Sequence, residues 1–335
     1  MTKKLIFRAD GNDKTGLGHL YRLFAFIEMV KDTYNYTFVT RFTSTTQIIP
    51  EEYPLMLISE DIDHLEEPQW ISEGFSPKES IIIIDGYHFK TPYQKKLKEL
   101  GFSIIYIDDL EKYHMYADIV INHSGAALKS KYLAESYTKF SLGVQYALLR
   151  PKFLNEAKSI REIDEIDTVF VCFGGADEFN FSYKASKALL EIDYIKEIKL
   201  VVGAAYKHDE IWDLKKMYPE RLKIYKNLSE VDLLGVMKSC NLAISPTSTI
   251  LYELTCVKMP IISGYFVENQ KSVYKWFKEQ ECFYGVDDFV HFNFKELANI
   301  LFQINKSYIK KYMYNQHKVI DGYQKSRLLG LITQL

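Results

Sequence analysis

The stretch LIFRADGNDKTGLGH, residues 5–19, indicates how the first half of the chain folds. It opens with an apolar run, Leu5–Ala9, which is typical of a buried β-strand. A loop with three glycines follows, and a helical pattern begins at His19. A strand, a tight loop and a helix in this order start a parallel βαβ unit, in which the loop lies at the carboxyl end of the strand. Because parallel sheets bind ligands at that end, this loop is the first candidate site.

Short apolar runs alternate with amphipathic stretches along the rest of the chain, which predicts an α/β fold of doubly wound parallel sheets. Strands that are apolar on both faces, such as Ile81–Ile84, belong in a sheet covered by helices on both sides. In the first half we expect strands at Leu5–Ala9, Tyr36–Thr40, Leu55–Ile58, Ile81–Ile84, Ser103–Ile107 and Ile119–Ile121, and helices at His19–Lys31 and Pro92–Leu100. In the second half we expect strands at Thr168–Phe173, Ile198–Val202, Leu222–Tyr225, Leu242–Ile244 and Ile261–Ser263, and helices at Phe181–Glu191, Asp209–Met217, Val231–Ser239, Ser248–Val257, Gln270–Glu279 and Phe294–Ile304.

The length of 335 residues is about twice the usual domain size, so it predicts two domains. The charged stretch Asn155–Asp167 separates the two series of strands and has no clear period, which makes it the expected linker. We therefore predict a Rossmann-like domain over residues 1–155 and a second one over residues 156–335, whose C-terminal helices cross back to the first. A ligand is expected in a cleft that the two domains face.

Composition excludes several classes of protein. An apolar fraction of 47% and a charged fraction of 26% are ordinary for a globular protein, and a net charge of −2 gives no electrostatic footprint for nucleic acid. No apolar run reaches membrane-spanning length and no signal-peptide core opens the chain, so we expect a cytoplasmic protein without membrane insertion. The widely spaced cysteines predict reduced thiols and no metal site: Cys172, Cys240, Cys256 and Cys282.

The glycine loop before the first helix carries the first candidate residues. Gly11, Gly16 and Gly18 let the backbone approach a substrate closely, although their spacing is neither a dinucleotide fingerprint nor a Walker loop. His19 falls in the first helical turn, where the helix dipole disfavours the imidazolium. A neutral imidazole suits a general base, although a histidine at this position also serves as a cap or a packing residue.

Two loops of the second half suit a diphosphate. Gly174 and Gly175 form a glycine turn before a helix, either as a phosphate loop or as a plain turn in which Asp177 caps the helix. Ser248 and Thr249 open another helix, where their hydroxyls can bond phosphate oxygens or simply cap it.

Two further positions suit the rest of a nucleotide sugar. Glu253 lies one turn beyond Thr249 on the same helix face, where its carboxylate can accept both hydroxyls of a ribose. Asn269 and Gln270 precede a later helix, and their amides can bond sugar hydroxyls or amides. Either feature alone is also compatible with a purely structural role.

Taken in order, these motifs resemble the UDP-2,4-diacetamido-2,4,6-trideoxy-β-L-altropyranose hydrolase family of pseudaminic acid synthesis over nearly the whole chain. The resemblance implies a GT-B-like fold, related to the N-acetylglucosaminyltransferase of peptidoglycan synthesis, and metal-independent hydrolysis of a UDP-sugar without a cofactor. The residues that carry it are Arg8 to Gly11 with Gly18-His19, Ile84 to Tyr87, Asp108-Asp109, Tyr146 to Arg150, Gly174 to Asp177, Ser245 to Glu253, and Asn269-Gln270.

The resemblance also implies roles for single residues. His19 is the base that activates water, Tyr87 lies near the reacting sugar, Glu253 binds the ribose and Asn269 contacts the sugar diphosphate. Two departures bear on the identity of the sugar. Gly86 stands where a histidine is expected before the tyrosine, and Pro246-Thr247 replace glycines.

The predicted reaction is an inverting displacement at the anomeric carbon, in which water attacks and UDP departs from the opposite face. We expect Asp10, as a catalytic residue, and Asp108, as a substrate contact, to orient His19 or the sugar, although either aspartate can instead cap its own strand end. Arg8 is expected to bind substrate. Helix N-termini at Gly175 and Thr249 stabilise the charge on departing UDP. The alternatives are a glycosyltransferase on the same scaffold and a nucleotide-sugar binding protein without catalysis. The expected partner is the UDP-sugar, bound by a monomer.

Overall fold

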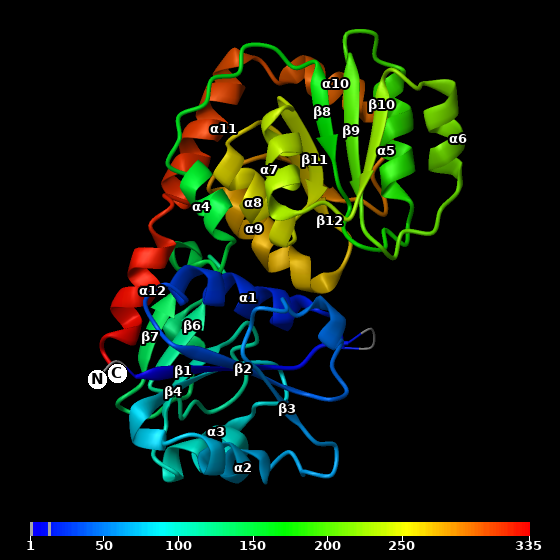
Figure 1. Cartoon of the computed structure of the whole chain (residues 1–335). Coiled ribbons are helices and arrows are strands. Elements are labelled where there is room, and N and C mark those ends of the chain that lie inside the picture. Colours follow the sequence, from blue (N-terminus) through cyan, green and yellow to red (C-terminus); the bar gives the residue numbers. More distant parts are fainter. Residues whose placement is uncertain (1–2, 13–14) are drawn as a thin grey trace. The chain divides into compact units, whose positions relative to one another are not determined.

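The structure, a computed structural model, describes residues 3–12 and 15–335. The chain forms two compact units, Met1–Pro151 with Tyr323–Leu335, and Lys152–Gly322 (Figure 1). The chain passes from one unit to the next at the start of helix α4 (Pro151–Glu156), whereas the predicted boundary follows residue 155. The difference arises because the helix continues into the charged stretch that was expected to be linker.

The first unit is a parallel sheet with the strand order β3-β2-β1-β4-β5-β6-β7. Helices α1 and α12 contact each other, as do α2 and α3, and Figure 1 shows these pairs on opposite faces of the sheet. The strands are β1 Lys4–Ala9, β2 Tyr36–Arg41, β3 Leu55–Ile58, β4 Ser80–Asp85, β5 Ser103–Ile107, β6 Ile119–Asn122 and β7 Lys139–Leu142. The helices are α1 Gly18–Val30, α2 Glu67–Gly74, α3 Thr91–Glu99 and α12 Gln324–Ile332.

The second unit is a parallel sheet with the order β10-β9-β8-β11-β12-β13. Its strands are β8 Thr168–Val171, β9 Glu197–Val202, β10 Leu222–Lys226, β11 Leu242–Pro246, β12 Ile261–Tyr265 and β13 Tyr284–Asp288. Its other helices are α5 Phe181–Leu190, α6 Glu210–Met217, α7 Glu230–Lys238, α8 Thr249–Val257, α9 Lys271–Glu279, α10 Leu297–Gln303 and α11 Lys306–Val319. Short 3-10 helices lie at Thr46–Ile48, Pro77–Glu79, Lys129–Lys131, Val144–Tyr146, Glu268–Gln270 and Phe294–Glu296.

The predicted fold class is confirmed, since both units are parallel sheets of alternating strands and helices. Every predicted strand is present within a few residues, and β4 is buried at each position, as its apolar sequence requires. The structure adds two strands that the sequence analysis missed, β7 and β13, and each lies at the edge of its sheet. The last helix, α12, is part of the first unit.

Each sheet reverses its strand order at one point. In the first sheet β1 lies between β2 and β4, and in the second β8 lies between β9 and β11. The crevice outside the carboxyl ends of two strands that diverge in this way is where doubly wound sheets bind ligands. The loops that follow β1, β4, β8 and β11 are therefore the places to look for function.

Candidate functional site

His19 and Asp85 meet at the point where the first sheet reverses. Nδ1 of His19, in the first turn of α1, lies 2.7 Å from Oδ1 of Asp85, the last residue of β4. The Asp85 side chain is completely buried, whereas that of His19 is 13% exposed. Arg22, one turn along α1, donates to both Asp85 oxygens, at 2.6 Å from Nε and 2.5 Å from Nη2. We call Arg22, Asp85 and His19 the His19 set.

The arginine in this set keeps the aspartate ionised, and the aspartate fixes the tautomer of the histidine. Burial alone would raise the pKa of Asp85, but the charge and hydrogen bonds of Arg22 bring it below its usual value. An ionised Asp85 accepts the Nδ1 proton of His19, and this leaves Nε2 unprotonated. Arg22 Nη2 also lies 3.1 Å from Nδ1, but a nitrogen that donates to Asp85 does not accept a second proton. His19 thus has the arrangement of a general base.

Tyr87 and Asp109 border the His19 set. The rings of Tyr87 and His19 meet edge to face with their centroids 4.6 Å apart. The Tyr87 hydroxyl donates to Asp109 Oδ2 at 3.3 Å, and Arg22 Nη1 lies 3.2 Å from the same oxygen. Burial, and then the Asp109 carboxylate, raise the pKa of Tyr87, so the phenol remains a hydrogen-bond donor. The structure therefore places the predicted Tyr87 against the predicted base.

A second histidine, His123, follows β6 near the same charges. Burial, and then the positive charge of Arg22, lower the pKa of His123 to about 4. Its ring is accordingly neutral at pH 7. The sequence analysis gave His123 no role, because a lone histidine after a strand has no motif around it.

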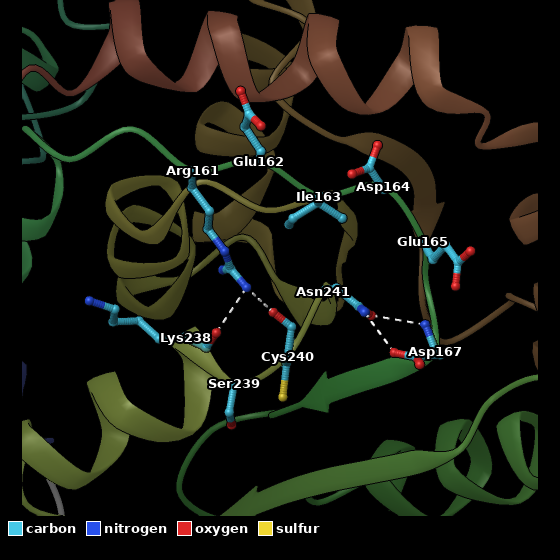
Figure 2. A pocket seen from close by; sticks show the side chains of 10 residues that line it. All are labelled: Arg161, Glu162, Ile163, Asp164, Glu165, Asp167, Lys238, Ser239, Cys240 and Asn241. Carbon is cyan, nitrogen blue, oxygen red and sulfur yellow. Dashed lines mark hydrogen bonds between the residues drawn. The ribbon is translucent and has the colours of Figure 1, made fainter.

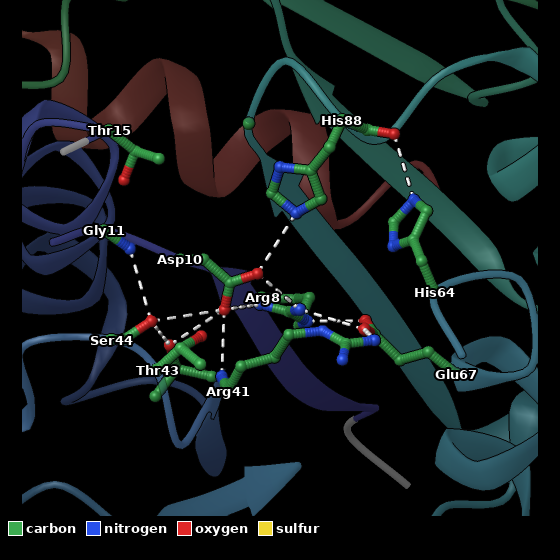
Figure 3. A network of polar contacts seen from close by, with 12 residues as sticks. Arg8, Asp10, Gly11, Thr15, Arg41, Thr43, Ser44, His64, Glu67 and His88 are labelled. Carbon is green, nitrogen blue, oxygen red and sulfur yellow. Dashed lines mark hydrogen bonds and ion pairs between the residues drawn. The ribbon is translucent and has the colours of Figure 1, made fainter. Parts of the chain in front are cut away.

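Asp10, predicted to orient His19 or the sugar, has a set of partners of its own that includes Arg8 and His88 (Figure 3). Asp10 accepts hydrogen bonds from Arg8, at 2.5 Å and 2.7 Å, and from the backbone N–H of Arg41 at 2.9 Å, while Nε2 of His88 lies 3.1 Å from Oδ2. The partner of His19 is Asp85. Burial would raise the pKa of Asp10, but Arg8 and His88 hold it well below its usual range.

Arg8 was predicted to bind substrate and is instead a buried support. It has no exposed surface, and its guanidinium donates to Glu67 through Nε at 2.6 Å as well as to Asp10 (Figure 3). Glu67 begins α2 and also accepts from Nη2 of Arg41 at 3.0 Å. A fully paired and buried guanidinium cannot contact a ligand, so Arg8 acts through Asp10.

Asp108 faces away from the His19 set. Its Oδ2 accepts from the Tyr132 hydroxyl and from the backbone N–H of Glu111, both at 2.8 Å. Burial raises the pKa of Asp108. Its neighbour Asp109 is the aspartate of this pair that borders the His19 set, and the substrate contact of Asp108 stays a prediction.

The glycines of the first loop have separate roles. A Cβ on Gly11 would lie 2.9 Å from the Gly16 carbonyl and from Leu20, and Gly16 has a φ of +84°. Both positions therefore need glycine to close the loop. Gly18, the first residue of α1, has open space where a side chain would be. Gly16 likewise has open space at this position, so the loop leaves room beside both Gly16 and Gly18.

The loop after β8 packs closely against Gly203, the residue that follows β9. Gly174 has a φ of +88°, and a Cβ on Gly203 would lie 2.4 Å from the Gly175 Cα. Asp177 accepts the backbone N–H groups of Phe181 and Ser182 at 2.9 Å and 2.8 Å, so both of its oxygens cap α5. Of the two alternatives for Asp177, the structure thus has the helix cap.

The N-terminus of α8, by contrast, is left open. Ser248 stands at the N-cap without a side-chain cap bond, and Thr249 is exposed at the first helical position. Thr247 is buried and donates to carbonyls at Gly264 and Gln270, which fixes the loop where glycines were expected. Ser248 and Thr249 are therefore placed to bind an anion.

Glu253 is buried on α8 near Cys172, which follows β8. Burial, and to a smaller extent the Glu253 carboxylate, raise the pKa of the Cys172 thiol to about 11. This cysteine is therefore not a nucleophile at neutral pH. All four cysteines lie buried as free thiols. The ribose contact of Glu253 stays a prediction.

Asn269 and Gln270 differ in exposure and in hydrogen bonding. Asn269 is exposed in the 3-10 helix after β12. Gln270 is buried, and its Oε1 accepts the backbone N–H of Phe266 at 3.1 Å. Asn269 is thus available to a ligand, while Gln270 holds the loop that presents it.

A cavity of the second unit lies away from these loops. It has a volume of about 360 Å³, and Figure 2 shows its lining from the linker and from the segment between α7 and β11. Arg161 donates there to the carbonyls of Lys238 and Cys240, and Asn241 accepts from the backbone of Asp167. Asp167 and Asn241 precede β8 and β11, so the cavity is at the amino ends of these strands and apart from the candidate site.

Two further kinds of site are not found in the part of the chain that the structure describes. Residues 3–12 and 15–335 hold no group of three or more His, Cys, Asp or Glu side chains that could bind a metal ion. Among the same residues, no helix combines the length and apolar character that crossing a bilayer requires.

Comparison with solved structures defines the class of protein. The chain matches MurG of Acinetobacter baumannii with a TM-score of 0.70 at 12% identity, over 99% of this chain and 100% of that one. It matches Anabaena HepE, solved in complex with UDP, with a TM-score of 0.62 at 12% identity over the full length of both. At such identity the likeness concerns the fold alone, and it confirms the GT-B-like architecture.

The comparison of sequences is more specific. The chain is 27% identical, over 277 residues, to the UDP-2,4-diacetamido-2,4,6-trideoxy-β-L-altropyranose hydrolase of Campylobacter jejuni, covering 82% of this chain and 95% of the relative. It is 26% identical, over 278 residues, to the spore coat polysaccharide biosynthesis protein SpsG of Bacillus subtilis, covering 81% and 80%. The resemblance to the hydrolase predicted from the motifs is thereby confirmed.

The matches do not all extend over the whole of the related protein. The chain is 27% identical to MJ1062 of Methanocaldococcus jannaschii over 81% of its own length, but it spans only 57% of that protein. No family model matches the chain.

Proposed function

We propose that this protein hydrolyses a UDP-linked diacetamido-trideoxy sugar at the anomeric C–O bond and releases UDP and the free sugar with inversion. The observation that carries the proposal is the His19 set, in which a buried aspartate, paired with a largely covered arginine, holds the imidazole by Nδ1. The relative from Campylobacter jejuni is named for hydrolysis of such a substrate, and this supports the choice of reaction.

In the proposed reaction His19 Nε2 takes a proton from water as the water oxygen bonds to the anomeric carbon. The bond from that carbon to the diphosphate oxygen breaks, and the electron pair leaves with UDP. Asp85 stabilises the imidazolium that forms, as the aspartate of a catalytic triad does. The Tyr87 hydroxyl, whose proton is donated to Asp109, is proposed to accept a hydrogen bond from the water or the sugar beside the His19 ring. UDP is a good leaving group, so no general acid is required.

We assign UDP binding to the second unit. The uncapped N-terminus of α8 offers backbone N–H groups and the hydroxyls of Ser248 and Thr249 to the phosphates. Glu253 is proposed to bind the ribose, and Asn269 to contact the sugar diphosphate. A cytoplasmic, monomeric protein that binds no nucleic acid and needs no cofactor stays the expectation.

A glycosyltransferase on the same scaffold is the second candidate, because structures of this fold include MurG and HepE. The two reactions differ only in what attacks the anomeric carbon. A fold shared with transferases does not decide between them.

The deciding experiment incubates the purified protein with UDP-2,4-diacetamido-2,4,6-trideoxy-β-L-altropyranose in ¹⁸O-labelled water, with no acceptor and with EDTA present. We expect release of UDP and incorporation of one ¹⁸O into the sugar, at a rate that EDTA does not change. Incorporation of ¹⁸O into the released UDP, turnover that requires an added acceptor, or activity restored by a divalent cation would contradict the proposal. A panel of other UDP-sugars serves as the control for substrate identity.

A further inference from the structure

Beside the His19 set lies a second set of the same composition, Arg8, Asp10 and His88. Arg8 is buried without exposed surface, as Asp85 is in the first set, and it donates to both oxygens of Asp10. Nε2 of His88 lies 3.1 Å from Asp10 Oδ2, and the His88 side chain is 40% exposed. In both sets an arginine therefore fixes an aspartate, and one nitrogen of a partly exposed imidazole lies within 3.1 Å of that aspartate. Figure 3 shows the second set.

The two sets are neighbours because their aspartates end adjacent strands. Ala9 of β1 pairs with Asp85 of β4, and Asp10 directly follows Ala9. Adjacent strands lie about 4.8 Å apart, which is on the scale of one sugar ring. Consecutive residues of the loop after β4 serve the two sets, since Tyr87 packs against His19 and His88 pairs with Asp10.

The charge balance shows that the second set does not need His88 as a counterion. Two arginines, Arg8 and Arg41, already pair with two carboxylates, Asp10 and Glu67. Asp10 Oδ1 also accepts from the Thr40 hydroxyl at 3.1 Å and from the backbone N–H of Arg41. The charges of the buried part of the network thus balance among these four side chains, and the His88 imidazole is its partly exposed end.

The backbone at Gly86 is shaped to admit this imidazole. A Cβ on Gly86 would lie 2.8 Å from His88 Cε1 and 3.1 Å from Nδ1. The departure noted at position 86 therefore makes room for a histidine two residues later. The ring also packs on Phe89, with the centroids 3.9 Å apart. His88 is held in one orientation by contacts on both its polar and its apolar sides.

We propose, on the basis of the hydrolase function above, that His88 is a specificity-determining residue that bonds a hydroxyl or acetamido N–H group of the sugar. Nε2 lies 3.1 Å from Asp10 Oδ2, which leaves Nδ1 as the ring nitrogen for a ligand. In the Nε2-protonated tautomer, Nδ1 is an acceptor and selects a donor on the ligand. The bond is made in the same unit as His19, so it concerns the sugar and not the UDP. The second set thus orients the ring whose anomeric carbon the first set attacks.

The test uses calorimetry in a His19→Ala background, so that the intact UDP-diacetamido sugar is not consumed. We expect His88→Phe, which keeps the ring volume, to weaken binding of this UDP-sugar about tenfold, the usual size of one lost hydrogen bond in a site. Binding of UDP alone should change less than about twofold. An unchanged dissociation constant for the UDP-sugar, or an equal loss for UDP, overturns the proposal.

The matched control is His114→Phe. His114 is also a histidine of the first unit, 42% exposed, with Nε2 2.9 Å from a carboxylate, that of Glu135. It should leave both dissociation constants unchanged. UDP-glucose as a third ligand assigns the group that is bonded: a loss confined to the diacetamido sugar supports an acetamido N–H, and a loss shared by UDP-glucose supports a hydroxyl.

Failure of this inference is distinguishable from failure of the hydrolase function, because the readout is binding and not turnover. If the wild-type protein binds the UDP-sugar without hydrolysing it, the proposed reaction fails while the role of His88 is still measured. Thermal melts check that His88→Phe is folded. Should it unfold, His88→Gln, which keeps an acceptor, is compared instead with His88→Ala, and equal affinities for the UDP-sugar in these two variants overturn the proposal.

Discussion

Each sheet has one point where its strand order reverses, and the two points have the same topology. The residues that occupy them differ in kind. At the carboxyl ends of β1 and β4, charged side chains pair with one another and hold His19 in one tautomer. At the carboxyl ends of β8 and β11, the N-terminus of α8 has no side-chain cap at Ser248 and no acidic residue in its first turn. A proton acceptor must be fixed before the substrate arrives, whereas an anion site needs donors that the protein has not already used.

Within the second unit, the N-termini of helices α5 and α8 differ in the same way. Asp177 caps α5 and takes two of its backbone N–H groups, while α8 has no such acid at its start. We therefore expect phosphate to bind at α8, and the glycine loop before α5 to contribute only the backbone of Gly174 and Gly175. The comparison predicts that variants of the first unit lose turnover and variants of the second lose UDP affinity.

The largest expected effect is that of His19→Ala. Removing the base takes away an interaction needed only in the transition state, so turnover should fall about 100-fold to 10,000-fold. Affinity for UDP, measured by calorimetry, should stay within about threefold. His114→Ala, which removes another partly exposed histidine of the first unit, is the control. A folded His19→Ala protein with near wild-type turnover would end the proposed mechanism.

Asp85→Asn should come next, with a loss of turnover on the order of 100-fold. An amide at this position no longer enforces the Nδ1-protonated tautomer of His19, and it leaves Arg22 without its buried counterion. The control is Asp109→Asn, because Asp109 also contacts Arg22, at 3.2 Å, but does not contact His19. If the two variants lost turnover equally, Asp85 would matter only through Arg22. Chemical denaturation separates a loss of fold from a loss of rate.

The fold was readable from the sequence because most strands lie inside their sheets. A central strand must be apolar on both faces, and runs such as Ile81–Ile84 carry that pattern openly. The missed strands, β7 and β13, are edges, where polar residues such as Lys139 and Asp287 are tolerated and protect against aggregation. No local pattern marks such short polar strands until their neighbours are known.

The sequence analysis predicted only part of the candidate site. His19 and Tyr87 were found in motifs, but the partner of His19 was sought at Asp10, which is close in sequence, instead of Asp85, which is close in space. Two features could have identified it: Asp85 ends the most apolar strand of the first half, and Arg22 lies three residues after His19 on the same helix face. Choosing between the aspartates requires the strand order, since β1 and β4 are neighbours only in the folded sheet.

In the second unit, Glu253→Ala should weaken UDP binding by about 2 kcal/mol, or roughly 30-fold, because one carboxylate accepts both ribose hydroxyls. Turnover at saturating substrate should change little. Glu268→Ala removes an exposed acid that pairs only with Lys271, and it serves as the calorimetric control. An unchanged dissociation constant for UDP in the folded Glu253→Ala variant would mean that Glu253 has only a structural role in α8.

The smallest expected effect is on the free energy of unfolding, which His123, near the charges of the first unit, makes dependent on pH. The folded pKa of His123 is about 4, below the ordinary value of about 6.5, because of burial and then of Arg22. Between these values the unfolded chain takes up a proton that the folded chain does not, so stability falls as the pH falls. At pH 5 the loss from this residue is about 2 kcal/mol relative to pH 7.

The measurement is chemical denaturation of the wild type and of His123→Asn at pH 7 and pH 5. Asparagine does not titrate, so the variant should lose about 2 kcal/mol less than the wild type on acidification, whatever other groups contribute to both. His114→Asn is the control, since His114 is half-exposed and paired with Glu135. Equal losses in the wild type and in His123→Asn would show that the charges around Arg22 do not keep this ring neutral. In that case a protonated His123 would have to be counted among the groups that set the electrostatics of the His19 set.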